Sequence, residues 1–149
     1  VRRAFAESRA SEHEALIAAL LDACEFCDRP ENREHVITTL ARREYVNTEP
    51  ASLRAGLTCD FDFGHGITRR VPAFDVFHRD GANEPSADKA AWVLRHLRNS
   101  GLAKNPADLT PALGARVFRR DIYERAERLR SSTPETIENE KPDTQLAIA

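Results

Sequence analysis

Two carboxylates and one imidazole lie close together in the stretch TCDFDFGHG, residues 58–66. A calcium loop of the EF-hand type needs oxygen ligands at its first, third and fifth positions and a glutamate at its twelfth. Counted from Asp60, the fifth position is a glycine and the twelfth a valine, so this pattern is not met. Alternation along a strand explains the stretch better, with Asp60 and Asp62 facing water and the phenylalanines beside them facing the core. We therefore expect a strand with no metal site, followed by a solvated turn at His65.

The C-x-x-C pair formed by Cys24 and Cys27 has the spacing of a redox or zinc motif. A redox pair of the thioredoxin type needs its first thiol at a helix N-terminus, where the pKa of the thiol is lowered. Here the pair closes a predicted helix, and the negative end of the helix dipole raises a thiol pKa. A structural zinc site needs four ligands, and Cys59 is the only other cysteine. We expect buried, inert thiols, and a thiol or zinc site stays the alternative.

A third polar cluster lies in VFHRDGANEP, residues 76–85, on a predicted loop between a strand and a helix. Its candidate ligand-binding residues are His78, Arg79, Asp80 and Asn83. Polar groups on a loop held by rigid neighbours can form a recognition site, although a solvated turn explains the same residues. The chain carries no nucleophile elbow, phosphate-binding loop or dinucleotide fingerprint. We therefore expect no enzymatic activity, no catalytic residues and no cofactor.

The composition is that of an ordinary globular protein, with 31% charged residues and a net charge of −2. This balance gives no broad attraction to nucleic acid, so we expect no nucleic-acid partner. The chain begins with Val1 and contains no methionine. We expect it to be a piece of a longer protein whose N-terminus lies elsewhere.

The elements that position these clusters are predicted to be mainly helical, with one small antiparallel β-hairpin over about residues 59–71. Apolar residues at helical spacing predict helices at about residues 12–27, 30–42, 49–56, 87–99, 111–118 and 121–130. No series of strand, helix and strand occurs, which argues against a doubly wound sheet within this chain. We expect a helical domain over residues 1–130 and a disordered polar tail over residues 131–149.

Helix caps and core positions follow from the same patterns. Ser11 and Glu14 form the spacing of a capping box, and Asp28, Ser86 and Asp121 each stand where a helix N-cap is expected. The residues expected to be largely buried are apolar positions of the predicted helices and strand: Leu16, Leu20, Val36, Leu40, Phe61, Phe63, Trp92, Val93 and Leu97.

The order of the motifs resembles a known family. The quoted segments are EALIAALLDACEFCDRPENREHVITTLARREYVN, then FDFGHG, then FHRDGANEPSADKAAWVLRHLRNSGL, then VFRRDIYERA. Together they resemble the C-terminal part of the nitrate- and bicarbonate-binding proteins of ABC transporters, over about residues 5–130. That family has the type II periplasmic binding protein fold, so the resemblance implies the helical C-terminal portion of an incomplete α/β lobe.

In the family, two lobes clamp a small inorganic anion, and the closed form docks on the membrane permease. The resemblance therefore implies the N-terminal lobes of the parent protein, an ABC permease and a small anion as partners. It also implies that the main anion contacts come from sequence preceding this region. We expect a non-catalytic C-terminal fragment of a substrate-binding component for nitrate, nitrite or bicarbonate, periplasmic or membrane-anchored in a bacterium.

Two other contexts, and association of the fragment with itself, stay open at this point. The same fold occurs in cytoplasmic nitrate-responsive regulators, in which this chain would be a helical module. Such domains are also fused to transporter ATPase subunits. Apolar surface left uncovered in a fragment can lead to a dimer.

Overall fold

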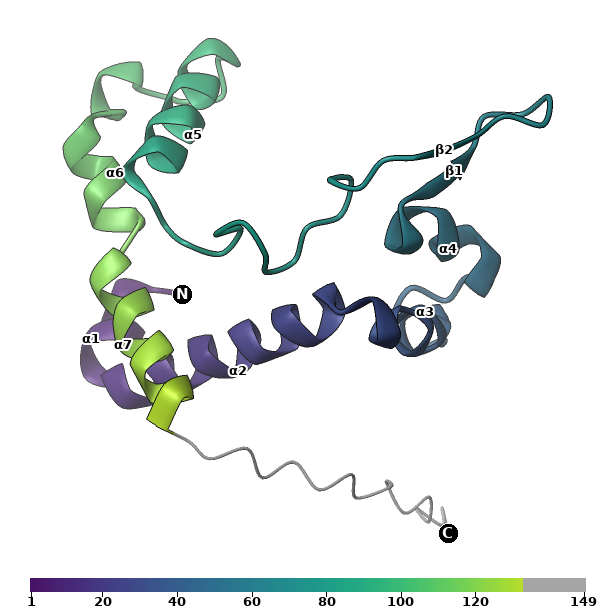
Figure 1. The fold of residues 1–149 in the computed structure, drawn as a ribbon. Helices are drawn as coiled ribbons and strands as arrows, with labels where there is room; N and C mark the ends of the chain where they lie inside the picture. Colours follow the sequence, from purple (N-terminus) through teal and green to yellow (C-terminus); the bar gives the residue numbers. More distant parts are fainter. Residues whose placement is uncertain (133–149) are drawn as a thin grey trace, which may run out of the picture.

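The computed structural model describes residues 1–132, which are mainly helical with one two-stranded antiparallel sheet (Figure 1). The predicted fold class is thereby confirmed at this level. The elements are α1 (Arg3–Ser8), α2 (Ala10–Asp28), η1 (Pro30–Asn32), α3 (Arg33–Ala41), α4 (Pro50–Thr58), β1 (Asp60–Asp62), β2 (Thr68–Arg70), α5 (Ala87–Asn99), η2 (Pro106–Asp108), α6 (Pro111–Val117) and α7 (Arg120–Ser132). The expected tail over residues 131–149 begins inside α7, and residues 133–149 lie outside the described part.

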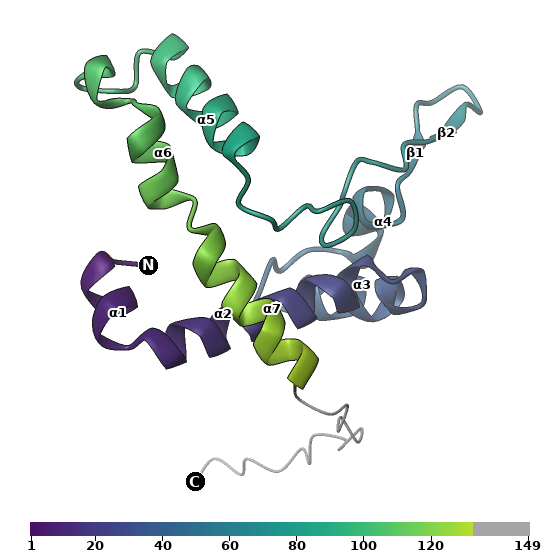
Figure 2. The ribbon, with the colours of Figure 1, turned by 60° about the vertical axis from the view of Figure 1, so that its left-hand side comes forward.

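Helix α2 is the longest element, and α1, α3 and α7 contact it. Helix α1 lies at its N-terminal end and α7 packs across its middle, whereas α3 and α4 lie at its C-terminal end. Figure 2 shows α7 crossing α2, while the α5–α6 pair and the hairpin extend from opposite ends of the molecule. Within residues 1–132, no helix is long and apolar enough to cross a bilayer.

Two small apolar clusters lie along α2. At the middle of the helix, Ala18 and Leu21 of α2 pack against Ala126 of α7, which is fully buried. The second cluster contains the buried residues Val36, Ile37 and Leu57, with Cys27, Leu40, Leu53 and Phe77 packed around them. Because neither cluster includes α5 or α6, that helix pair is held separately from the rest of the described chain.

Several expected core residues are exposed, which corrects the predicted core. Leu16 and Leu20 are 47% and 56% exposed, because the side of α2 that faces α7 carries Ile17, Ala18 and Leu21 instead. Phe63, Trp92 and Leu97 are exposed as well. Val36 is buried as expected, and Leu40, Phe61 and Val93 are half-buried.

The structure confirms some of the predicted helix caps and contradicts others. Ser86 caps α5 by accepting the backbone N–H of Lys89, and Thr110 caps α6 in the same way. Ser11 does not cap α2, because the helix begins one residue earlier, at Ala10. Asp121 lies inside the first turn of α7, where it pairs with Arg119 and Arg125.

The small helix pair α5–α6 packs at small side chains. A Cβ atom added to Gly114 of α6 would lie 3.1 Å from Cδ1 of Leu94 and 3.3 Å from Cβ of Ala90. Because these contacts are tighter than ordinary van der Waals separations, glycine is what allows the two helices to approach at this point.

Candidate functional site

The hairpin carries no convergent acidic site. Its register pairs Asp60 with Arg70 and Asp62 with Thr68, and the Asp60 carboxylate lies 3.3 Å from Nη1 of Arg70. The Asp62 carboxylate accepts the backbone N–H of Gly64 at 2.7 Å. Both aspartates are therefore directed outward, as predicted. Among residues 1–132, no three His, Cys, Asp or Glu side chains gather in a way that holds a metal ion.

The aromatic face of the hairpin is only half covered. Phe61 packs edge-on against Phe74, with ring centroids 4.6 Å apart. Phe63 is 60% exposed, which contradicts its predicted burial. Phe63 follows the end of β1, whereas Phe74 packs on Phe61, and the guanidinium of Arg69 lies over the Phe63 ring at 5.7 Å.

The C-x-x-C cysteines are half-buried rather than fully buried, and all three cysteines of the chain are free thiols. Burial raises the pKa of the Cys27 thiol, and the neighbouring Cys24 raises it further. A raised pKa lowers the fraction of reactive thiolate at neutral pH. Cys59 lies elsewhere, with its Sγ 4.0 Å from the carbonyl oxygen of Pro72. These positions favour inert thiols.

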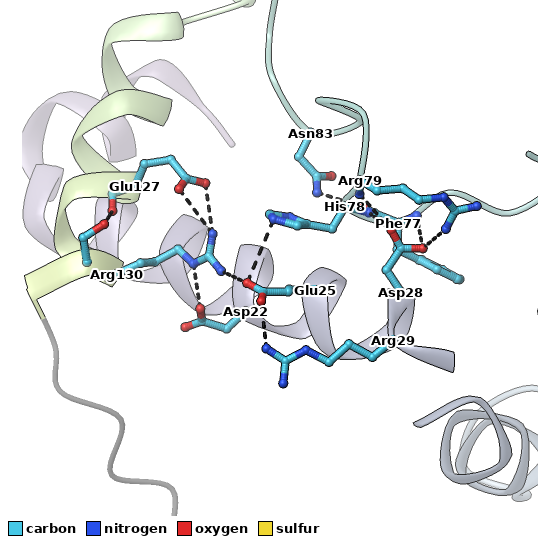
Figure 3. A network of polar contacts seen from close by, with 11 residues as sticks. Asp22, Glu25, Asp28, Arg29, Phe77, His78, Arg79, Asn83, Glu127 and Arg130 are labelled. Carbon is cyan, nitrogen blue, oxygen red and sulfur yellow. Dashed lines mark hydrogen bonds and ion pairs between the residues drawn. The ribbon is translucent and has the colours of Figure 1, made fainter. Parts of the chain in front are cut away.

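The candidate site is a polar network along α2 whose first half is built around Asp28 (Figure 3). Asp28 ends α2, and its carboxylate accepts backbone N–H groups from Phe77 at 3.5 Å, His78 at 3.2 Å and Arg79 at 2.7 Å. The guanidinium of Arg79 pairs with the same carboxylate, and Nη2 of Arg33 lies 3.1 Å from it. A buried carboxylate thus occupies a ring of donors that has the chemistry of an anion-binding site.

This environment sets the charge state of Asp28. Burial alone would raise the pKa of the carboxyl, but the N–H groups of Arg79, His78 and Phe77 outweigh it, so the pKa is lowered. The side chains of Asp28 and Arg33 are 8% and 10% exposed. They therefore form an ion pair shielded from water, whose loss on one side leaves a buried charge on the other.

The four predicted ligand-binding residues do not converge on an open site. Besides pairing with Asp28, Arg79 donates to the carbonyl oxygen of Pro72 at 2.6 Å. Asn83 donates its side-chain amide to the carbonyl oxygen of Phe77 at 2.7 Å. Asp80 is exposed at a backbone φ of 59°. Arg79 and Asn83 are thus used in shaping the loop.

His78 directs its ring along α2 toward Glu25, with Nε2 4.0 Å from a carboxylate oxygen (Figure 3). Its Nδ1 atom is buried and has no hydrogen-bond partner among the described residues. His78 therefore links the loop to the second half of the polar network.

The second half of the network joins α2 to α7. Arg130 of α7 is 13% exposed and pairs with Asp22 at 2.6 Å, with Glu25, and with Glu127 at 3.0 Å. Burial alone would lower the pKa of Arg130, but the bonds to Asp22 and Glu25 outweigh it and raise the pKa. The pKa of Glu25 is lowered, first by Arg29 and then by Arg130.

The acidic side chains of α2 form a row that the sequence interpretation missed. Asp22, Glu25 and Asp28 recur every three residues, a spacing that places them near one face of the helix. The row holds α7 at one end and the loop at the other (Figure 3). The described contacts therefore give this network a positioning role, and its cations already have anionic partners within the chain.

Comparison with known proteins gives matches at the sequence level. The chain is 37% identical over 113 residues to the nitrate import ATP-binding protein NrtC of Synechococcus elongatus, covering 75% of this chain and 16% of that protein. It is 27% identical over 128 residues to the bicarbonate transport ATP-binding protein CmpC of the same species, covering 86% and 18%. The nitrate/nitrite binding protein NrtA of a Nostoc species is 26% identical over 95 residues, covering 63% and 22%.

The extent of these matches is limited. The chain spans less than a quarter of the length of each of these relatives. No protein family profile matches the chain. No solved structure matches it either.

Proposed function

We propose that this chain is a C-terminal helical portion of an NrtA-like substrate-binding domain. The premise is that the chain is a distant homologue of this domain, which is found in NrtA and in the C-terminal region of NrtC and CmpC. In this role it belongs to the substrate-binding component of an ABC transporter for nitrate, nitrite or bicarbonate. It packs on the remaining lobes of the domain, which supply the parts of the α/β fold that this chain does not contain.

The observation that carries this proposal is the sequence match itself. The matches are to the NrtA-like binding domain and not to the ATPase region. This relation supports a role in binding rather than catalysis. The mainly helical fold with one small sheet agrees with a portion of a lobe, because residues 1–132 lack the strand–helix–strand series that a complete α/β lobe requires.

The geometry of the loop over residues 76–85 favours an auxiliary role of this chain in anion binding, in which the chain does not itself hold the anion. A small inorganic anion needs uncommitted N–H donors and positive charge. In this chain the backbone donors of residues 77–79 and the guanidinium of Arg79 are directed at the Asp28 carboxylate. An added anion would have to compete with that carboxylate, which is covalently fixed beside the donors.

We therefore predict that the 149-residue chain binds nitrate weakly or not at all. Calorimetric titration of the chain with sodium nitrate should give no saturable heat, with sodium chloride at equal ionic strength as the control. Nitrite and bicarbonate should behave in the same way. Tight binding with one nitrate per chain would contradict the prediction and would place a complete anion site within these residues.

Two relatives that match over three quarters or more of the chain carry names of ATP-binding proteins. This favours a second candidate context, in which the domain is fused to a transporter ATPase subunit. The two contexts are separated by reading the gene upstream of the codon for Val1. A preceding ATPase domain would support fusion, and a preceding export signal with binding-protein lobes would support a separate binding protein.

A further inference from the structure

The α5–α6 pair, residues 87–117, projects from the rest of the described chain (Figures 1 and 2). Its two helices pack chiefly on each other. The side chain of Leu94 on α5 lies over Gly114 of α6, and Arg98 donates to the carbonyl oxygen of the buried Leu109 at 2.7 Å. Because these contacts join α5 to α6 directly, the pair forms one structural unit.

The segments on either side of the pair are both fixed to α2. On the N-terminal side, residues 77–79 donate their backbone N–H groups to the Asp28 carboxylate. On the C-terminal side, α7 is held by Ala126 in the apolar cluster and by the ion pairs of Arg130. We call α2, α7 and residues 77–79 the α2–α7 frame.

The pair itself has few contacts with this frame. Neither of its helices contributes a residue to the two buried clusters along α2. Among residues 1–132, Lys89 is the one side chain of the pair that hydrogen-bonds outside it, and its acceptors are the carbonyl oxygens of Gly81, Ala82 and Glu84, just ahead of α5. A unit with so few contacts to its surroundings moves at low cost in free energy.

The two connections between the pair and the frame are short and lie side by side. Residues 84–86 lead into α5, and residues 118–119 join α6 to α7. At this second connection the backbone N–H groups of Arg119 and Arg120 each bond to a carbonyl oxygen two residues earlier, at 3.1 Å, so the helical bonding is interrupted. Arg120 pairs with Glu84 of the first connection at 3.0 Å. The two connections therefore meet at one place.

We propose that the α5–α6 pair pivots as one unit against the α2–α7 frame, about residues 84–86 and 118–119, and that the Glu84–Arg120 ion pair limits the rotation. Hinges commonly consist of a few residues at the ends of elements. The Glu84 and Arg120 side chains are 33% and 63% exposed, and exposed ion pairs contribute little stability, so this pair restrains the rotation without preventing it. The rotation changes the direction in which the exposed Trp92 faces relative to α2. The proposal does not rest on the proposed function.

The test measures residual dipolar couplings of backbone N–H groups in the weakly aligned 149-residue chain. The couplings of the α5–α6 pair and those of the α2–α7 frame are fitted separately, each to the geometry of its own unit. We expect each set to fit its unit, with a smaller degree of order for the pair than for the frame. Equal degrees of order would overturn the proposal. Couplings of the pair that fit no single unit would overturn it as well, because α5 and α6 would then not move together.

Two substitutions among the partners of Arg120 locate the pivot. Glu84→Ala removes the carboxylate that links the two connections, and it should lower the degree of order of the pair further. Glu124→Ala is the matched control, because Glu124 pairs with the same guanidinium at 2.9 Å but lies within α7. This control should leave the degree of order of the pair unchanged. An equal loss of order in both variants, or no loss in Glu84→Ala, would overturn the proposal.

Discussion

Replacing Asp28 with alanine should lower the free energy of unfolding by about 3–5 kcal/mol. The substitution removes the acceptor for the backbone N–H groups of residues 77–79, and it leaves the buried guanidinium of Arg33 without its carboxylate partner. Nη1 of Arg33 already has no hydrogen-bond partner among the described residues, so the protein offers it little compensation. Urea unfolding followed by circular dichroism measures the loss.

Two further variants separate this mechanism from a general effect of removing an acid. Asp28→Asn keeps one acceptor oxygen and should lose less stability than Asp28→Ala. Asp60→Ala removes a carboxylate of the exposed Asp60–Arg70 pair, with side chains 44% and 66% exposed. Exposed pairs contribute about 0–1 kcal/mol. If Asp28→Ala were as mild as Asp60→Ala, the inferred importance of the buried carboxylate would be wrong.

The pH dependence follows from the lowered pKa of Asp28. A group whose pKa is lower in the folded state stabilises the fold fully above its unfolded value, about 3.9 for Asp. This contribution is lost as the pH falls through the folded value. The difference in unfolding free energy between the wild type and Asp28→Asn should therefore be constant near neutral pH and narrow below about pH 4.

Formate should restore part of the stability lost in Asp28→Ala. The variant retains the N–H donors of residues 77–79 and the guanidinium groups of Arg33 and Arg79, which in the wild type surround a carboxylate. A ligand that binds only the folded state raises stability in proportion to the logarithm of its concentration once the site is saturated. Thermal unfolding with formate, against chloride at equal ionic strength, measures the effect. Equal shifts in the variant and the wild type would rule out a specific site.

The contrast between Ser86 and Asp28 shows which parts of the fold could be predicted from the sequence. Ser86 accepts an N–H only three residues ahead, so local spacing is sufficient to identify it. Asp28 has a similar local pattern, but its carboxylate accepts N–H groups from residues 77–79, about fifty positions later. No helix-cap pattern carries that long-range information. The three-residue spacing of Asp22, Glu25 and Asp28 was the available signal for an acidic face.

The orientation of α2 was difficult to predict for a related reason. Its apolar stripe is broad, and it includes Leu16 and Leu20 as well as Ile17 and Leu21. Periodicity predicts an apolar side of a helix but does not decide which part of a broad stripe meets the partner. The position of helix α7 determines which part is buried, because Ala126 packs against Ala18 and Leu21. The same limit applies to the alternation over residues 60–63, which places Phe61 against Phe74 but wrongly predicts that Phe63, beyond the end of β1, is buried.

Ile37→Ala should lower the free energy of unfolding by about 2–5 kcal/mol, because it removes a fully buried side chain and leaves a cavity. Ile37 has no exposed surface and lies with Val36 and Leu57 in the cluster that joins α3, α4 and the end of α2. Leu20→Ala is the matched control, since Leu20 is aliphatic, helical and 56% exposed, and it should change stability by less than about 0.5 kcal/mol. Urea unfolding of both variants at one protein concentration measures the difference. Equal losses would mean that Leu20 is covered in solution and that the assignment of the core to Ile37 and its neighbours is incomplete.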